Sequence, residues 1–204
     1  GPNPNFLFGR AVYLITAAEL AASGLPNGSG ISGIGWNYNL APGVTAINVP
    51  LKVYLENTSD TTMRGSTDWA TEIGTMTLAH NGTISLANGF SPVDFGFSGS
   101  GISPFTYAGG GIYVAFDFGR YNSTLATPNA TTVGVLVNTS LVPGGLYSAS
   151  TASAPTSVTT SSSERAETRL KVTSSLQSDA SVDQVMSLGS VPLGLAGPQI
   201  IQAV

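Results

Sequence analysis

Apolar and polar residues alternate with a period of two over much of the chain, which is the pattern of strands that bury one face. The clearest alternation covers residues 34–39, 49–56, 75–78, 93–98, 112–119, 133–137 and 166–172. Asn-Gly pairs at 27–28, 81–82 and 88–89 are expected to form turns between such segments. Because no strand–helix–strand rhythm interrupts them, the pattern predicts an all-β fold, an antiparallel β-sandwich that is jelly-roll-like.

One short N-terminal helix is predicted over residues 16–24. Thr16 is placed to cap the first turn, and Glu19, three residues later, can bond back to it, as in a capping box. Gly24 is a natural C-terminal stop. Since about two turns of helix are unstable alone, we expect this segment to pack on the sheet.

The chain divides into three segments by composition. Residues 1–5 are predicted to be a tag remnant and an N-terminal tail, because Gly1-Pro2 is typical of a cleaved expression tag. Residues 6–173 are predicted to form the β-sandwich module, with a Ser/Thr-rich loop or exposed edge at 148–163. Residues 174–204 are predicted to be a linker and the start of a following domain.

Charged residues make up 9% of the chain, against roughly 25% in an average protein. The surface must therefore consist mainly of Ser, Thr, Asn and Gly, which is typical of proteins that are extracellular or on the cell surface. The net charge of −4 leaves no basic patch, so nucleic acid is not an expected partner. The absence of cysteine excludes disulfides and thiol nucleophiles. No apolar run approaches the ~20 residues of a membrane-spanning helix, so membrane insertion is not expected.

Four segments, in order along the chain, resemble a known domain: Gly9–Leu20, Leu51–Leu55, Pro104–Gly110 and Arg165–Leu170. That domain is the β-sandwich found in large secreted and cell-surface proteins of Bacteroidetes, many of them multidomain, adhesin-like cargo of the type IX secretion system. The resemblance implies location and architecture, with neighbouring domains of the same chain as partners, rather than chemistry. Residues 60–62 also resemble the O-glycosylation signal of Bacteroidetes, which implies that Thr61 carries the glycan.

Catalytic residues are hard to assemble from this sequence. His80 is the single histidine and falls on the apolar side of its strand, so we expect a structural residue at a strand end. Asp94 and Asp117 point away from the core and could be neighbours on adjacent strands. A retaining glycosidase needs two carboxyl groups about 5–5.5 Å apart, but two outward acids more often solvate a face or hold calcium. We therefore expect no enzymatic activity.

Three acidic residues are candidate ligands of a structural calcium ion, the one cofactor that the sequence suggests. Glu56, Asp60 and Asp68 lie close together in sequence, and jelly-roll domains often hold calcium at strand ends. The alternative is an acidic loop without metal.

Aromatic residues give the best indication of a ligand. Tyr54 and Tyr113 fall on the polar side of their strands together with Asp94 and Asp117, and Trp69 lies in a loop. Such a face suits sugar binding, because rings stack on the C–H faces of pyranoses while carboxylates bind hydroxyls. The alternative is a face that a neighbouring loop or domain covers.

These patterns predict a non-catalytic binding or adhesion module of a secreted multidomain surface protein. Its partner would be a glycan or an extracellular or cell-surface protein. One alternative is a structural spacer domain of an adhesin stalk, without a small ligand. Another is an accessory domain of a secreted hydrolase. The first two differ in whether Tyr54 and Tyr113 are exposed and close together.

Overall fold

The structure is a computed structural model. It describes residues 8–40, 46–65, 67–87, 89–119, 135, 137–138, 140–141, 143–150, 152–163, 165–173 and 199–203, with the backbone alone at 40, 46–47 and 199–203. The predicted tag remnant and most of the predicted linker lie outside these residues.

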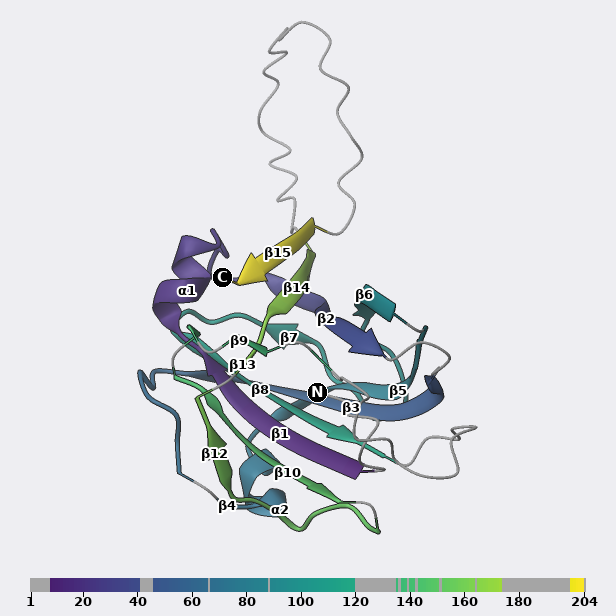
Figure 1. The fold of residues 1–204 in the computed structure, drawn as a ribbon. Helices are drawn as coiled ribbons and strands as arrows, with labels where there is room; N and C mark the ends of the chain where they lie inside the picture. Colours follow the sequence, from purple (N-terminus) through teal and green to yellow (C-terminus); the bar gives the residue numbers. More distant parts are fainter. Residues whose placement is uncertain are drawn as a thin grey trace, which may run out of the picture.

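Strands dominate the chain, and two short helices interrupt them (Figure 1). The helices are α1 (Ala17–Ala22) and α2 (Trp69–Ile73). The strands are β1 (Phe8–Ile15), β2 (Gly30–Leu40), β3 (Ala46–Thr58), β4 (Thr67–Asp68), β5 (Thr77–Leu86), β6 (Gly89–Gly96), β7 (Phe105–Thr106), β8 (Gly111–Phe118), β9 (Val137–Asn138), β10 (Gly145–Ser150), β11 (Ser157–Val158), β12 (Thr160–Ser162), β13 (Arg165–Ala166), β14 (Thr168–Thr173) and β15 (Gln199–Ala203). No helix among the described residues is long and apolar enough to cross a membrane.

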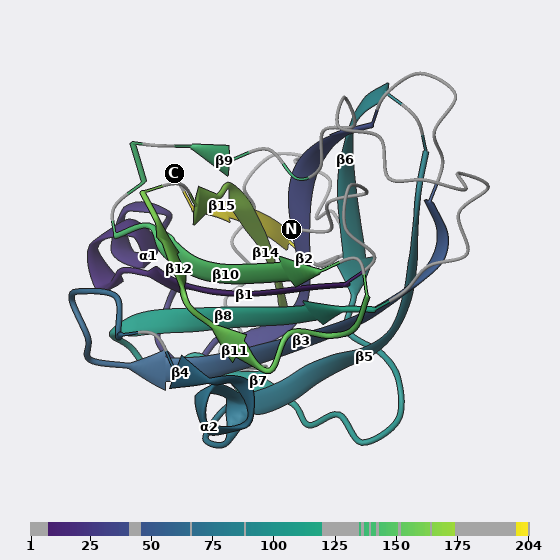
Figure 2. The same ribbon diagram turned by 60° about the horizontal axis from the view of Figure 1, so that its bottom comes forward.

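Two antiparallel sheets face each other and enclose the core (Figures 1 and 2). The larger sheet has the strand order β12-β10-β1-β8-β3-β5. The smaller sheet has the order β15-β14-β2-β6, with β7 paired to β2. The prediction of an all-β antiparallel sandwich is confirmed, whereas the jelly-roll connectivity stays a prediction.

The core lies between the inward faces of the two sheets, as the alternation predicts. Trp36 of β2 is fully buried, and its ring meets the Phe116 ring of β8 edge-on at a centroid distance of 5.6 Å. A chain of buried hydrogen bonds joins the sheets beside this contact. Trp36 Nε1 donates to the Tyr13 hydroxyl at 3.0 Å, and that hydroxyl lies 2.8 Å from Thr168 Oγ1. The side chains of β1, β2 and β14 are thereby fixed to one another.

Helix α1 begins with the predicted capping box. Glu19 N donates to Thr16 Oγ1, and Thr16 N donates to Glu19 Oε2 at 2.7 Å. Leu20 is fully buried, which confirms that the helix packs on the sandwich. The buried guanidinium of Arg165 pairs with Glu19 and donates to the Leu14 carbonyl. The capping carboxylate therefore also anchors β13.

The turn expected at residues 81–82 is absent, because β5 continues through it. Gly82 lies under the His80 ring, and a Cβ there would come within 3.0 Å of His80 Cε1 and Nε2. The glycine at this position thus makes room for a neighbouring ring and does not form a turn. The Asn-Gly pair at 27–28 does form a turn, and Gly28 adopts a φ of 88°.

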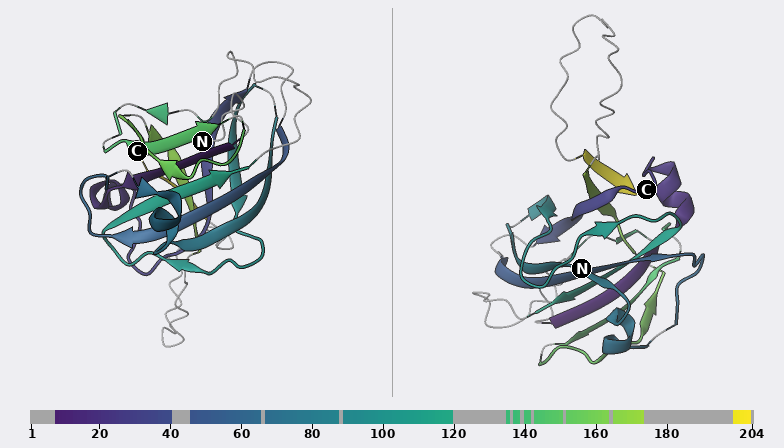
Figure 3. Two further views of the ribbon diagram at one scale, coloured as in Figure 1. Left: turned by 90° about the horizontal axis from the view of Figure 1, so that it is seen from below. Right: turned by 180° about the vertical axis from the view of Figure 1, so that it is seen from behind.

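A small third layer covers the outer side of the larger sheet. It consists of α2 and the antiparallel pair β4–β11, which lie in front of that sheet in Figure 2 and in the left view of Figure 3. The Ser/Thr-rich stretch contributes β11 to this layer and β12 to the edge of the larger sheet, which is the exposed edge that composition suggested.

The last strand, β15, pairs with β14 over Thr168–Val172. Its backbone therefore belongs to the smaller sheet, although residues 174–204 were expected to lead into another domain. The boundary of the module at residue 173 stays a prediction.

Candidate functional site

The expected exposed platform of Tyr54 and Tyr113 is wrong, because both rings are buried. Tyr54 is 8% exposed and Tyr113 is 0% exposed. Both do lie on the side of the larger sheet that faces away from the sandwich core. They are also diagonal neighbours, since Tyr54 pairs with Ala115 while Tyr113 pairs with Glu56. The third layer covers them, so the alternative of a covered face is the one that holds.

The covering layer forms a second apolar cluster with its own aromatic packing. Its buried members are Val12, Leu14, Tyr54, Trp69, Met76, Tyr113, Ala115, Leu146 and Val158. Trp69, expected in a loop, is the first residue of α2 and is 4% exposed. Its ring meets the Tyr54 ring edge-on at a centroid distance of 6.1 Å. Trp69 is therefore a packing residue rather than a free ligand contact.

Asp117 contacts the third layer indirectly, through Arg10. Arg10 Nη2 donates to Asp117 Oδ2 at 2.9 Å, and the Arg10 guanidinium lies 4.9 Å from the centre of the Trp69 ring. Arg10 also donates to the Pro155 carbonyl, beside β11. These contacts tie the β4–β11 pair to the larger sheet, and they occupy the Asp117 carboxylate.

The Tyr113 hydroxyl is the centre of a polar network beneath the 59–65 loop. It donates to Asp60 Oδ2 at 2.9 Å and accepts from the backbone N–H of Arg64 at 3.0 Å. The Arg64 guanidinium lies 4.1 Å from the centre of the Tyr113 ring. Burial and the neighbouring Asp60 raise the pKa of Tyr113 to about 12. The hydroxyl is thus a protonated structural donor at neutral pH and not a base.

Arg64 also forms ion pairs with two carboxylates from different elements. Its Nη2 donates to Glu56 Oε2 at 2.9 Å, and its Nε donates to Glu72 Oε1. Glu72 is 3% exposed, and its Oε2 has no hydrogen-bond partner. Burial raises the pKa of Glu72 despite the attraction of Arg64. The guanidinium therefore compensates two acids that would otherwise repel each other.

The three candidate calcium ligands have separate roles. Glu56 pairs with Arg64, and Asp60 accepts from Tyr113. Asp68 caps α2 by accepting from Thr71 N at 2.9 Å, and the hydrogen bonds from Thr71 lower the pKa of that carboxyl. Within the described part of the chain, no group of three or more acids or histidines is placed to hold a metal ion. Calcium binding by these residues therefore stays a prediction, as does the alternative of an acidic loop without metal.

Asp94 lies on the opposite side of the molecule from Asp117, so the expectation that they are neighbours on adjacent strands is wrong. Asp94 belongs to β6 of the smaller sheet and Asp117 to β8 of the larger sheet. Asp94 Oδ1 accepts from Arg169 Nε at 2.8 Å. Because an outward residue can lie on either of the two outer faces, strand periodicity alone does not bring two such acids together.

His80 is buried between the sheets in the middle of β5, not at a strand end. It is 2% exposed, and its ring packs against the tilted Phe95 ring with centroids 4.8 Å apart. Its Nδ1 accepts from Ser98 N at 3.2 Å, while Nε2 has no partner. Burial lowers the pKa of His80. The expectation of a structural histidine agrees with this placement.

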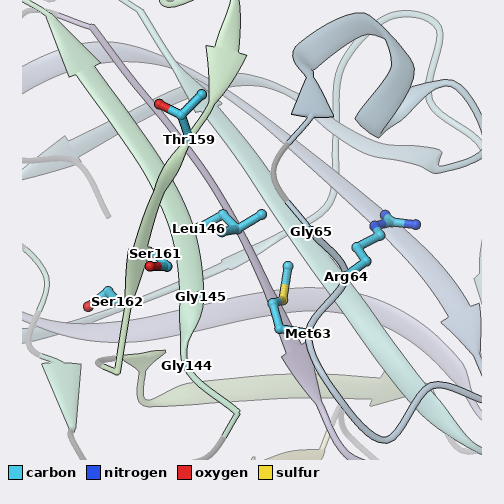
Figure 4. Close-up of a pocket in the computed structure, with 9 residues that line it drawn as sticks. All are labelled: Met63, Arg64, Gly65, Gly144, Gly145, Leu146, Thr159, Ser161 and Ser162. Carbon is cyan, nitrogen blue, oxygen red and sulfur yellow. The ribbon is translucent and has the colours of Figure 1, made fainter.

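A pocket with a volume of about 320 Å³ opens between the 63–65 loop, the start of β10 and β12 (Figure 4). Its lining residues are Met63, Arg64, Gly65, Gly144, Gly145, Leu146, Thr159, Ser161 and Ser162. In Figure 4 the Arg64 side chain extends away from β12, and its guanidinium is bound to Glu56 and Glu72. The pocket is therefore lined by apolar and hydroxyl groups, without an acid–base pair.

Sequence reasoning missed Phe90, which is 66% exposed on β6. The signal was present, because Val93 and Phe95 alternate inward and the same parity carried back along the strand turns Phe90 outward. The predicted glycosylation residue Thr61 is exposed in its loop, as a modified residue must be, and its modification stays a prediction.

No family model, no curated protein and no solved structure matches the chain. The resemblance to the Bacteroidetes domain accordingly stays a prediction.

Proposed function

We propose that this chain is a non-catalytic binding or adhesion module of a secreted, multidomain surface protein. The observation that carries the proposal is the use of its charged groups. Every carboxylate in the described part of the chain accepts a hydrogen bond from another side chain or a helix terminus, and each described arginine is in an ion pair. General acid–base catalysis needs a titratable group within reach of a substrate. The described carboxylates and arginines have structural partners instead.

The remaining surface chemistry is suited to weak, uncharged contacts. The edge strand β12 carries Thr160, Ser161 and Ser162, and the pocket beside it is lined by hydroxyls and glycines. The smaller sheet presents an exposed phenyl ring beside asparagines. Hydroxyls, amides and aromatic rings are the groups with which proteins bind sugars and extracellular surfaces.

A structural spacer is the second candidate function, and the burial of Tyr54 and Tyr113 favours it. A module that covers its aromatic face with its own residues resembles a stalk domain whose task is to hold its neighbours apart.

The test is a binding and turnover screen on the full chain. The chain is exposed to a glycan array and to immobilised mucin, collagen and fibronectin, and it is incubated with nitrophenyl glycosides and esters. We expect weak saturable binding to at least one immobilised ligand and no turnover. Turnover that stays with the purified chain would overturn the proposal. Absence of all binding would overturn its binding part and leave the spacer.

A further inference from the structure

The outer face of the smaller sheet carries an ordered row of side chains that the fold does not use for packing. On adjacent strands β6 and β2, Phe90 pairs with Asn39, Pro92 with Asn37, and Asp94 with Gly35. Their neighbours in sequence, among them Trp36 and Val93, point into the core. These three cross-strand pairs therefore lie on the outward face of the smaller sheet.

One end of this row is held rigid by Arg169 of β14. Its Nε donates to Asp94 Oδ1 at 2.8 Å, its Nη1 to Asn37 Oδ1 at 2.7 Å, and its Nη2 to the Trp36 carbonyl at 2.9 Å. Arg169 reaches across β2 because Gly35 has no side chain, and a Cβ there would lie 1.7 Å from Asp94 Oδ1. The Asp94 and Asn37 side chains are thus fixed before any ligand arrives, which lowers the entropic cost of binding.

Polar atoms on this face remain open to a ligand. The half-buried Asn39 amide makes no hydrogen bond to the described residues, and neither does Asp94 Oδ2. Phe90 beside Asn39 is the most exposed of the large hydrophobic side chains described. Phe90 offers a stacking surface, while the Asn39 amide beside it and Asp94 Oδ2 further along β6 can form hydrogen bonds.

We infer that this face binds a short oligosaccharide, with one pyranose ring stacked on Phe90 beside Asn39 and with hydroxyls of the following sugar rings bonded to Asn37 and Asp94. The inference rests on the proposed binding function and names its ligand class and site. At ~3.3 Å per residue, the row from Phe90 to Asp94 extends for about 13 Å, long enough for more than one sugar ring.

A protein partner fits this face less well than a sugar. A stable protein interface buries about 800 Å² on each partner around an apolar centre. Here the apolar part of the row is one phenyl ring and Pro92, and the rest is amide and charge. Such a mixture suits a ligand whose rings have apolar C–H faces and polar edges.

The experiment starts with a glycan array and continues with calorimetric titration of the best-bound oligosaccharide into the full chain. Phe90→Ala and Asn39→Ala are compared with Tyr147→Ala, because Tyr147 is also exposed, at 47%, but lies on β10 of the other sheet. Stacking is worth about a factor of ten in affinity, so Phe90→Ala should weaken binding roughly tenfold. Asn39→Ala should weaken it severalfold, and Tyr147→Ala should not change it. All three variants should keep the melting temperature of the parent chain.

Equal affinity of the parent chain and Phe90→Ala would overturn the assigned site while glycan binding itself stood. Binding of an immobilised protein but of no glycan would overturn the inferred ligand class and leave the proposed function intact. Binding of nothing at all would overturn both.

Discussion

Tyr13 and Trp36 join the two sheets through a hydrogen bond from which water is excluded, and removing both partners should cost less than the sum of the two single removals. The Trp36 side chain is 0% exposed and Tyr13 is 3% exposed. The Tyr13 hydroxyl accepts from Trp36 Nε1 and lies 2.8 Å from Thr168 Oγ1, which also donates to the Ala166 carbonyl. In Tyr13→Phe, Thr168 keeps that carbonyl as a partner, whereas the indole N–H of Trp36 has none.

The expected energies follow from that asymmetry. An unsatisfied buried donor costs about 1–3 kcal/mol, which is the expected loss in Tyr13→Phe. Trp36→Phe removes the donor and leaves a smaller ring, so it should cost about 1–3 kcal/mol through the cavity, less than the ~3–5 kcal/mol expected for Trp36→Ala. When Trp36 is already Phe, removing the Tyr13 hydroxyl leaves no buried donor without a hydrogen-bond partner. The second change should then cost about 0–1 kcal/mol, which gives a coupling energy of ~1–2 kcal/mol.

Urea unfolding, followed by both fluorescence and far-ultraviolet circular dichroism, measures all four proteins of this cycle. Each 1 kcal/mol should also lower the melting temperature by roughly 2–4 °C in a chain of this size. Tyr147→Phe is the matched control, because Tyr147 is 47% exposed, and its change should stay within about 0.5 kcal/mol. If Tyr13→Phe costs the same in both backgrounds, the hydrogen bond between the sheets does not carry the assigned energy.

Three further predictions concern groups that the fold buries. Burial favours the neutral form of Glu19, but Arg165 and the helix cap lower its pKa below 4.5 on balance. Glu19→Gln should therefore cost about 3–5 kcal/mol in urea unfolding at neutral pH, because it leaves Arg165 without a counter-charge. The extra free energy of unfolding of the parent chain over Glu19→Gln should shrink as the pH falls below 4.5 through the lowered pKa of Glu19. A difference in unfolding free energy that stays constant with pH would contradict the pairing with Arg165. Burial lowers the pKa of His80 below 6.5, so the unfolded chain binds more protons and stability should fall as the pH drops below that value. His80→Gln should show a shallower fall in the urea midpoint between neutral and mildly acid pH, and an identical slope would refute the burial argument. Trp69→Ala should cost ~3–5 kcal/mol by the same unfolding assay, and a loss under 1 kcal/mol would mean that the third layer is not a second core.

The periodicity of the sequence predicted the side of each strand on which a residue lies, but not what covers that side. Tyr54 and Tyr113 lie on the predicted side, yet they are buried. The layer that covers them comes from two distant parts of the chain, since Thr67 of β4 pairs with Val158 of β11. A two-residue pairing over such a separation leaves no periodic trace, and the helix that completes the layer spans only Trp69–Ile73.

Sequence motifs predicted side-chain contacts correctly where the contacting residues are close in sequence. The capping box of Thr16 and Glu19 spans three residues and was predictable. The partner of that carboxylate, Arg165, lies 146 residues away and was not. Gly82 shows the same limit, because an Asn-Gly pair predicts a turn, while the His80 ring that accounts for the glycine becomes visible only in the folded strand.

The low charge of the chain and the roles of its charged groups lead to the same conclusion about recognition. Charged residues are 9% of the sequence, and the described ion pairs join α1 to β13, the 59–65 loop to α2, β1 to β8, and β14 to β6. Charges placed in this way join separate elements of the fold to one another. Neutral amides, hydroxyls and the Phe90 ring are then the main groups left for a partner. On the proposed binding function, these groups would suit an uncharged ligand that is rich in hydroxyls, whereas on the proposed spacer function the module would have no ligand.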